Sequence, residues 1–308
     1  MGDGMIRHRL RWSLLGLAGL LLTVLTASLQ AQELTVSYAQ GRVEADGSSG
    51  WTNVALGQAI PSDTTIRLSG SSYLELNDSH GVNITINQPG TYALPRLIET
   101  ARLMDLPGIS QLLASIFSTL VSTAPRTTET VLGLRDTNEG AASSQAWVTS
   151  DVQPYLDDAI TFIHEGRYGD AKDQLLQAQA LASGRQADEV EYYRALLSSL
   201  TGKTRAAIAE MPVAMPRPGA SWAPGYALLE ARLDIDTFAF KAAVNELDSH
   251  SELLAANAQR APVYYFLRAL AYRGLRDTSA ERTNLAEVER VSPGSRLAAT
   301  SRKLLENL

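Results

Sequence analysis

The sequence of 308 residues contains no cysteine. This absence excludes disulfide bonds, thiolate metal sites, cysteine nucleophiles and a lipid-modified cysteine. Histidine is also rare: the four histidines are His8, His80, His164 and His250, and they do not cluster in the sequence. Because an imidazole metal site needs several histidines close together, the sequence predicts no metal centre and no cofactor.

Recognisable catalytic motifs are missing as well. The chain has no Gly-x-Ser-x-Gly nucleophile elbow and no Gly-Lys-Ser/Thr phosphate loop with its leading glycine. Residues 202–204 (Gly-Lys-Thr) come nearest, but they lack the upstream glycine. The pair His164-Glu165 resembles the start of a zinc-protease motif, yet Tyr168 stands where the second histidine would be. We therefore predict a protein without enzymatic activity.

Charge and composition narrow the class further. Asp and Glu number 33 against 27 Lys and Arg, a net charge of −6, which argues against a general nucleic-acid binder. Hydrophobic residues make up 45% of the chain, which is enough to build packed cores. A chain of this length predicts about two domains.

The N-terminus has the pattern of an export signal. Arg7, Arg9 and Arg11 precede an uncharged, mostly aliphatic run from Ser13 to Leu29. This pattern is typical of a secretory signal peptide, which we place at residues 1–32, with an uncleaved inner-membrane anchor as the alternative. Because no second run is long enough to span a membrane, we expect the rest of the chain to be exported. The predicted location is the bacterial periplasm.

Residues 33–95 have the pattern of short β-strands. Apolar and polar residues alternate around Leu34 and Val36, and again around Ile84 and Ile86. A period of two puts one face of each strand in a core and the other in water. Clusters of Gly, Pro, Asn and Asp separate the runs, as turns require. The segment therefore predicts a small all-β module, sandwich-like or barrel-like.

The order of residues in this module resembles that of a known family. The residues that carry the resemblance are Gly41, Arg42, Val43, Trp51, Val54, Gly57, Ile60, Asp63, Ile66, Ser69, Leu74, Leu76, Gly81, Ile84, Ile86 and Gly90. This succession is similar to that of the FecR-like periplasmic domain. The resemblance implies a β-fold in which Trp51 anchors the core and glycines form the turns, and it places the module at residues 33–136.

A helical insertion is predicted within this module at residues 96–123. Pro107-Gly108 should break it into two helices, and residues 108–123 carry no charge. Helices on a membrane surface usually carry Lys or Arg, so we favour a helix packed against its own domain over a membrane-surface or oligomerisation helix. Residues 127–135 resemble the strand that follows the β-module in FecR-like chains, and this resemblance implies one more strand that closes the module. Residues 137–150 predict a polar linker.

The remaining residues, 151–308, contain a repeated helical pattern. In the first copy, Ala159 and Ala171 are small residues where two helices would touch, and Tyr168 fills the turn between them. This copy resembles the tetratricopeptide repeat, whose period is about 34 residues. Three weaker copies follow, because Ala159, Ala195, Ala231 and Ala269 are 36, 36 and 38 residues apart. The predicted fold class is a multidomain β + α protein with an α-solenoid of about four helical hairpins.

The tetratricopeptide resemblance implies that the first helices of the hairpins line a concave groove that binds peptides. On this groove the resemblance places His164, Tyr192, Leu196, Arg232, Phe266, Leu270 and Arg273. We expect Arg232 and Arg273 to hold an acidic group of a partner, and Tyr192 and Phe266 to pack against its apolar side.

The predicted function is that of an exported scaffold or adaptor. It would bind an envelope protein or a cell-wall glycan through the repeat groove and the β-module. One alternative is a membrane-anchored periplasmic signal transducer of the FecR type, but the 12 residues before Ser13 are too few for a cytoplasmic regulatory segment. A further alternative is a polysaccharide-acting enzyme, which would need paired acids that the scattered carboxylates of the β-module do not supply.

Overall fold

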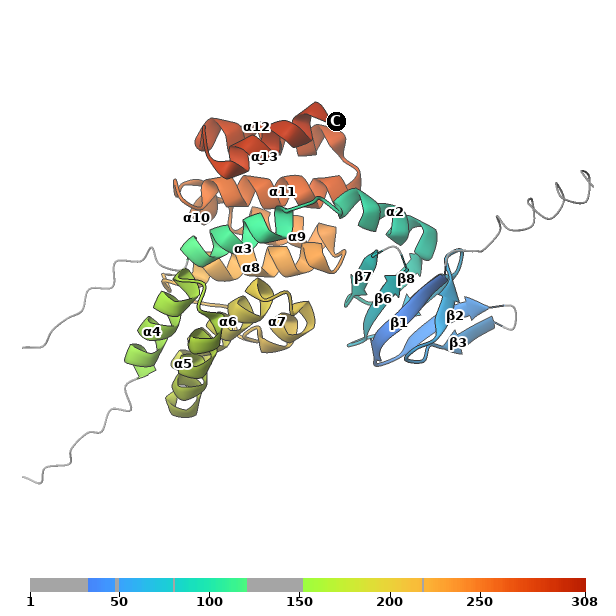
Figure 1. Cartoon of the computed structure of the whole chain (residues 1–308), viewed down its shortest axis with the longest axis horizontal. Helices are drawn as coiled ribbons and strands as arrows, with labels where there is room; N and C mark the ends of the chain where they lie inside the picture. The colour runs from blue at the N-terminus through green and yellow to red at the C-terminus, as the bar shows by residue number, and fades with distance from the viewer. Residues whose placement is uncertain (1–32, 48–49, 80, 121–151, 218) are drawn as a thin grey trace, which may run out of the picture. The chain divides into compact units, whose positions relative to one another are not determined.

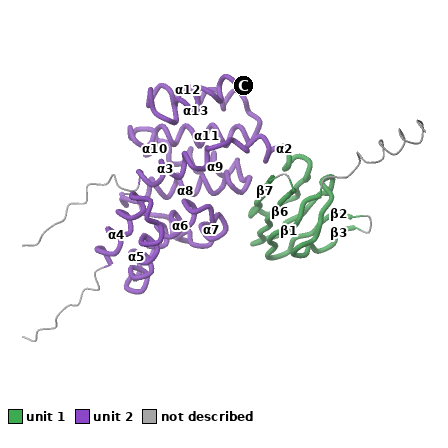
Figure 2. The backbone as a smooth tube through the Cα atoms, in the orientation of Figure 1, with its two compact units in different colours: residues 1–99 green, residues 100–308 purple. Residues whose placement is uncertain are grey.

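The computed structural model describes residues 33–47, 50–79, 81–120, 152–217 and 219–308. The predicted signal peptide, the strand predicted at residues 127–135 and the linker predicted at residues 137–150 lie outside the described residues. The chain divides into two compact units, residues 1–99 and residues 100–308 (Figure 2). The boundary falls within helix α2, Leu94–Met104.

Unit 1 consists of short antiparallel strands, as predicted (Figure 1). Its described strands are β1 (Glu33–Gln40), β2 (Val43–Gly47), β3 (Gly50–Asn53), β4 (Ala59–Pro61), β5 (Thr65–Leu68), β6 (Tyr73–Asp78), β7 (Asn83–Ile86) and β8 (Gly90–Ala93). One four-stranded sheet has the order β4-β1-β6-β7, and the other has the order β3-β2-β5-β8. Every neighbouring pair in these sheets is antiparallel.

The buried positions of unit 1 follow the alternation seen in the sequence. Leu34 and Val36 of β1 are at most 1% exposed, and so are Ile84 and Ile86 of β7. The residues between them are more exposed. Because each fully buried aliphatic side chain contributes about 1.5–3 kcal/mol, this alternation accounts for much of the core of the module.

Trp51 does not anchor this core, and the expectation taken from the family resemblance is wrong on this point. All four residues of β3 are exposed, and Trp51 is 38% exposed. The reason is its register: Trp51 pairs with Asp46, which faces solvent, so its ring points outward as well. The guanidinium of Arg67 lies 4.3 Å from the centroid of the ring. Arg67 and Arg42 also donate hydrogen bonds to the carboxylate of Glu44.

The predicted break between two helices is confirmed. Helix α2 ends at Met104, and helix α3 runs over Ile109–Leu120. Proline cannot continue a helix, and Gly108 has a φ of 80°, which glycine adopts without a steric penalty.

Helix α3 belongs to unit 2, whereas the sequence predicted that residues 96–123 form an insertion in the β-module. Its buried apolar residues form part of the core of unit 2. In the described part of the chain, no single helix has both the length and the apolar character to cross a membrane. Among the described helices, α2 and α3 taken together meet that test, with a bend of 65° between them.

The described part of unit 2 contains four helical hairpins where the repeated pattern predicted them (Figure 1). The first helices are α4 (Val152–His164), α6 (Arg185–Leu200), α8 (Ala223–Asp236) and α11 (Ala261–Leu275). The second helices are α5 (Tyr168–Leu181), α7 (Thr204–Glu210), α9 (Phe240–Ser249) and α12 (Thr278–Val291). The two helices of each hairpin pack against each other. A short helix α10 (Ser251–Ala255) precedes α11, and α13 (Arg296–Glu306) follows the last hairpin.

Small buried residues and a repeated turn explain the hairpins. The four anchor alanines Ala159, Ala195, Ala231 and Ala269 are at most 1% exposed. Seven residues after each alanine, the turn has a positive φ: 73° at Gly166, 72° at Gly202, 62° at Phe238 and 62° at Arg276. This conformation suits glycine, whereas it costs other residues about 1–2 kcal/mol. The turn geometry therefore repeats even where the sequence no longer supplies a glycine.

Candidate functional site

The structure buries six of the seven side chains that the sequence analysis placed on the repeat groove. Their exposed fractions are 4% for Tyr192, 0% for Leu196, 6% for Arg232, 0% for Phe266, 4% for Leu270 and 6% for Arg273. His164, the last residue of α4, is exposed. The six buried side chains therefore do not form an open surface for a peptide in this structure.

The two buried arginines are paired with acids of their own chain. The Nε atom of Arg273 lies 3.0 Å from Oε1 of Glu281, and the two side chains are 7% and 5% exposed. The Nε atom of Arg232 lies 3.6 Å from Oδ2 of Asp236. Burial raises the pKa of the Glu281 carboxyl, and the charge of Arg273 offsets only part of that effect. The expected contact between these arginines and an acid of a partner is therefore not available while these pairs remain buried.

Tyr192 connects the second hairpin to the third. Its ring stacks on Trp222 with 5.5 Å between ring centroids and 24° between ring planes. Its hydroxyl lies so close to Gly225 at the start of α8 that any side chain there would collide with it. Burial raises the pKa of the Tyr192 phenol well above its ordinary value. Tyr192 is thus a packing residue of the helical unit.

Helix α3 covers the apolar side of the first helices. It packs directly against α4 and α6, and the guanidinium carbon of Arg232 on α8 lies 5.5 Å from the centroid of the Phe117 ring. The buried residues of α3 are Ile109, Leu112, Leu113, Phe117 and Ser118. The apolar ones belong to the same hydrophobic cluster as α4, α6, α8 and α11. We call the surface of these four helices beneath α3 the first-helix face.

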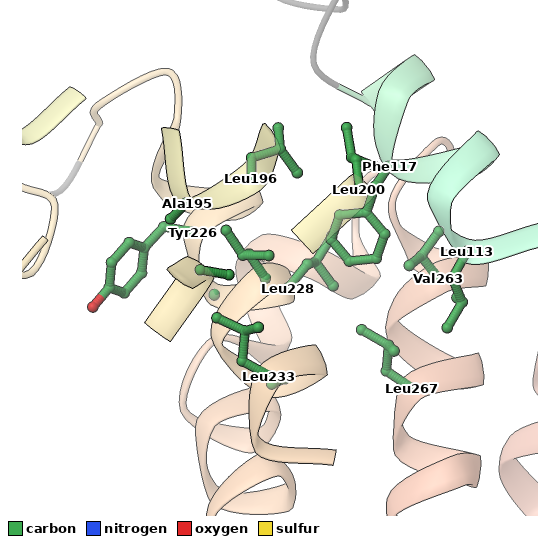
Figure 3. Packing of buried hydrophobic residues seen from close by; sticks show 14 of the residues in the cluster. Leu113, Phe117, Ala195, Leu196, Leu200, Tyr226, Leu228, Leu233, Val263 and Leu267 are labelled. Atoms are coloured by element: carbon green, nitrogen blue, oxygen red, sulfur yellow. The ribbon is translucent and has the colours of Figure 1, made fainter. Parts of the chain in front are cut away.

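Figure 3 shows how α3 lies within this cluster. Leu113 lies near Val263 and Leu267 of α11, whereas Phe117 lies near Leu200 of α6. The N-terminal half of α3 thus faces the last hairpin, and its last turn faces the earlier hairpins.

Leu113 and Phe117 are not among the residues that the sequence predicted for the site. The available signal was the lack of charge over residues 108–123, which predicted a helix packed on its own domain. That helix does pack on its own chain, but on the repeats. The spacing of apolar residues within one segment does not show which distant segment it packs against, so the contact between α3 and the first helices could not be predicted.

A cluster of carboxylates lies between α8 and α9. Glu230 and Asp234 are one turn apart on α8, and on α9 Glu246 places its Oε1 3.1 Å from Nδ1 of His250. Burial, reinforced by the charges of Glu230 and Glu246, raises the pKa of Asp234 to about 7. Burial also raises the pKa of Glu230 and of Glu246. Within the residues the structure describes, no three His, Asp or Glu side chains are arranged to hold a metal ion.

Two hollows lie elsewhere on unit 2. One, of about 610 Å³, is lined by the N-terminal end of α6 and by the irregular joint before α8, including Met215 and Trp222. The other, of about 360 Å³, lies between α5 and α7. Arg194 and Glu210, which both line the second hollow, form an ion pair with 2.7 Å between Nη2 and Oε1, so their charges neutralise each other.

Comparison with known proteins assigns nothing further, because no family model, no curated protein and no solved structure matches this chain. The FecR-like and tetratricopeptide-like assignments therefore stay predictions.

Proposed function

We propose that the chain is a non-enzymatic scaffold of the bacterial cell envelope that binds another protein through its first-helix face. One observation carries the proposal: the uncharged amphipathic helix α3 is held on that face. Helix-in-groove recognition requires a continuous apolar surface with room for one helix. A surface that holds α3 meets this requirement.

The predicted export signal and the FecR-like order of the β-module support the envelope as the compartment. The β-module supplies a second surface, where Trp51 is exposed beside Arg67 and Glu44. Two binding surfaces on one chain raise the apparent affinity for an assembly that engages both. This arrangement suits an adaptor that connects an envelope protein to a second envelope component.

The test begins with capture from envelope extract of the source bacterium, with the purified chain as bait and chemical cross-linking. A captured protein is then purified and titrated against the chain by calorimetry. We expect a direct one-to-one complex. Trp51→Ala should bind the partner with the same affinity as the unmodified chain, because the main contact lies on the repeats. If no captured protein binds in the purified titration, or if a wall glycan binds in its place, the proposed function is wrong.

A further inference from the structure

We infer that the segment recognised by the first-helix face is an uncharged amphipathic helix of about three turns, which replaces α3 and lies in the same direction. This inference rests on the proposed function and names the class of partner for its site. The alternative occupant, α3 of a second copy of the chain, is an outcome of the test below.

The length and pattern of the partner helix follow from α3. Its 12 residues form a helix of about 18 Å at 1.5 Å per residue. The buried apolar residues Ile109, Leu112, Leu113 and Phe117 form one stripe at the spacing of an amphipathic helix. Its exposed residues are Ser110, Gln111, Ser115 and Thr119, all polar and uncharged. A partner helix needs the same stripe to bury the same apolar surface.

Arg232 determines which residue fits at the position of Phe117. Its side chain is 8% exposed, and its Nη1 atom is buried with no hydrogen-bond partner among the described residues. A cation opposite this guanidinium would be repelled, and a carboxylate would lose its hydration in a buried site. An aromatic ring is attracted to the guanidinium without either cost. We therefore expect an aromatic residue in the partner at this position.

Arg232 also determines the direction of the helix. Phe117 lies in the last turn of α3, which ends at Leu120. The C-terminal end of a helix carries partial negative charge, so a cation beside the last turn is favourable. A helix in the opposite direction would bring its positive end to Arg232.

The connection of α3 to the repeats permits the exchange. Within each hairpin the two helices are joined by two or three residues, as at residues 165–167 and 276–277. In contrast, 31 residues, 121–151, separate α3 from α4. None of the four described hairpins includes α3, so its departure would leave the pairing of helices within each of them intact. In the free chain α3 is therefore a competitor of the partner, held at high effective concentration.

The probe is a fluorescent peptide that copies residues 109–120, with two lysines added at its N-terminal end for solubility. Its binding is measured by fluorescence anisotropy on three forms of the full chain. The first is the unmodified chain, and the second is Phe117→Ala, which loosens α3 but leaves the first-helix face unchanged. The third is Leu113→Cys/Val263→Cys, which would hold α3 in place once mass spectrometry without reductant shows that its disulfide has formed; the absence of other cysteines from the sequence makes that bond unambiguous.

We expect the peptide to bind Phe117→Ala at least ~10-fold more tightly than the unmodified chain, because the truncation weakens the competing helix. The oxidised double-cysteine chain should not bind it, and reduction should restore binding. A fourth form, Ser115→Ala on the exposed side of α3, serves as the control and should leave the affinity unchanged. A peptide with alanine at the position of Phe117 should bind at least ~10-fold more weakly. Circular dichroism and thermal melting establish that each variant is folded.

The inference is overturned if the oxidised and reduced double-cysteine chains bind the peptide alike, or if neither they nor Phe117→Ala binds it. Concentration-dependent dimers of Phe117→Ala in the absence of peptide would assign the face to a second copy of the chain instead. Failure of this inference is distinct from failure of the proposed function. A captured partner that binds the oxidised and reduced chains equally would leave a scaffold role standing, but it would refute the assignment of that role to the first-helix face.

Discussion

The carboxylate cluster between α8 and α9 predicts that the repeat unit loses stability as the pH rises towards neutrality. The perturbation that tests this is Asp234→Asn, which removes one charge and keeps the shape of the side chain. Asp234 is partly buried and faces the like charges of Glu230 and Glu246. The folded chain therefore favours the protonated form of Asp234, whereas the unfolded chain does not.

The magnitude follows from the pKa. A rise from 3.8 to about 7 is a shift of roughly 3 units, and each unit corresponds to about 1.4 kcal/mol. This gives an upper limit of about 4 kcal/mol, which we reduce to about 2–4 kcal/mol because water screens a partly exposed side chain. Below about pH 4 both states hold the proton and the effect vanishes. Between about pH 4 and pH 7 only the unfolded chain ionises, so stability falls with rising pH, and above about pH 7 the loss is constant.

The assay is urea denaturation of the chain and of Asp234→Asn at pH 4.5, 6, 7 and 8. We expect the variant to gain little at the lowest pH and about 2–4 kcal/mol at pH 8. Asp173→Asn, on the exposed side of α5, controls for the loss of one negative charge. A gain for Asp234→Asn that does not change with pH would refute the reasoning, because desolvation and repulsion of the ionised form require it to change.

Three further predictions concern the packing of the chain. Glu281→Gln should lower the free energy of unfolding by about 3–5 kcal/mol because it leaves buried Arg273 unpaired. The double variant Arg273→Met/Glu281→Leu should recover most of the lost stability. Urea denaturation measures both effects. In melting experiments Gly202→Ala should destabilise by about 1–2 kcal/mol, since its φ is 72° and no atom lies within 4 Å of the added Cβ. The matched change Gly169→Ala, in equally open space within α5, should stabilise by up to about 1 kcal/mol. Trp51→Ala should cost about 1 kcal/mol or less because the ring is on an edge strand, and a loss of about 3 kcal/mol, typical of a core tryptophan, would contradict the register given for β3.

The hairpins could be predicted because their causes are local. An alanine where two helices touch, and a turn seven residues later, recur in every copy, and the anchors at Ala159 and Ala195 are fully buried. The strands of unit 1 were predictable for the same reason, since alternation is a property of consecutive residues. Trp51 was misplaced because its direction depends on which strand it pairs with and in which register, and a family resemblance does not fix this for an edge strand.

The candidate site could not be predicted because its arrangement is not local. The spacing of the repeats placed Arg232 on the inner side of the hairpins, but it could not show that Phe117 of α3 packs against its guanidinium. The missing information was a contact between α3 and helices that begin more than thirty residues later, at Val152. A groove assigned from repeat spacing alone therefore identifies a surface and leaves its occupant undetermined.

The lack of charge on α3 connects the structural observation to the function. A helix that served only as a permanent part of the core would gain solubility and stability from charges on its exposed side, yet Ser110, Gln111, Ser115 and Thr119 supply none. Without charges on that side, α3 makes no ion pair through it that would have to break before the helix leaves. The attachment of α3 then depends on the apolar stripe and on Arg232 over Phe117. Those are the contacts that a second helix of the same pattern can reproduce, so the features that hold α3 in place also allow it to be replaced.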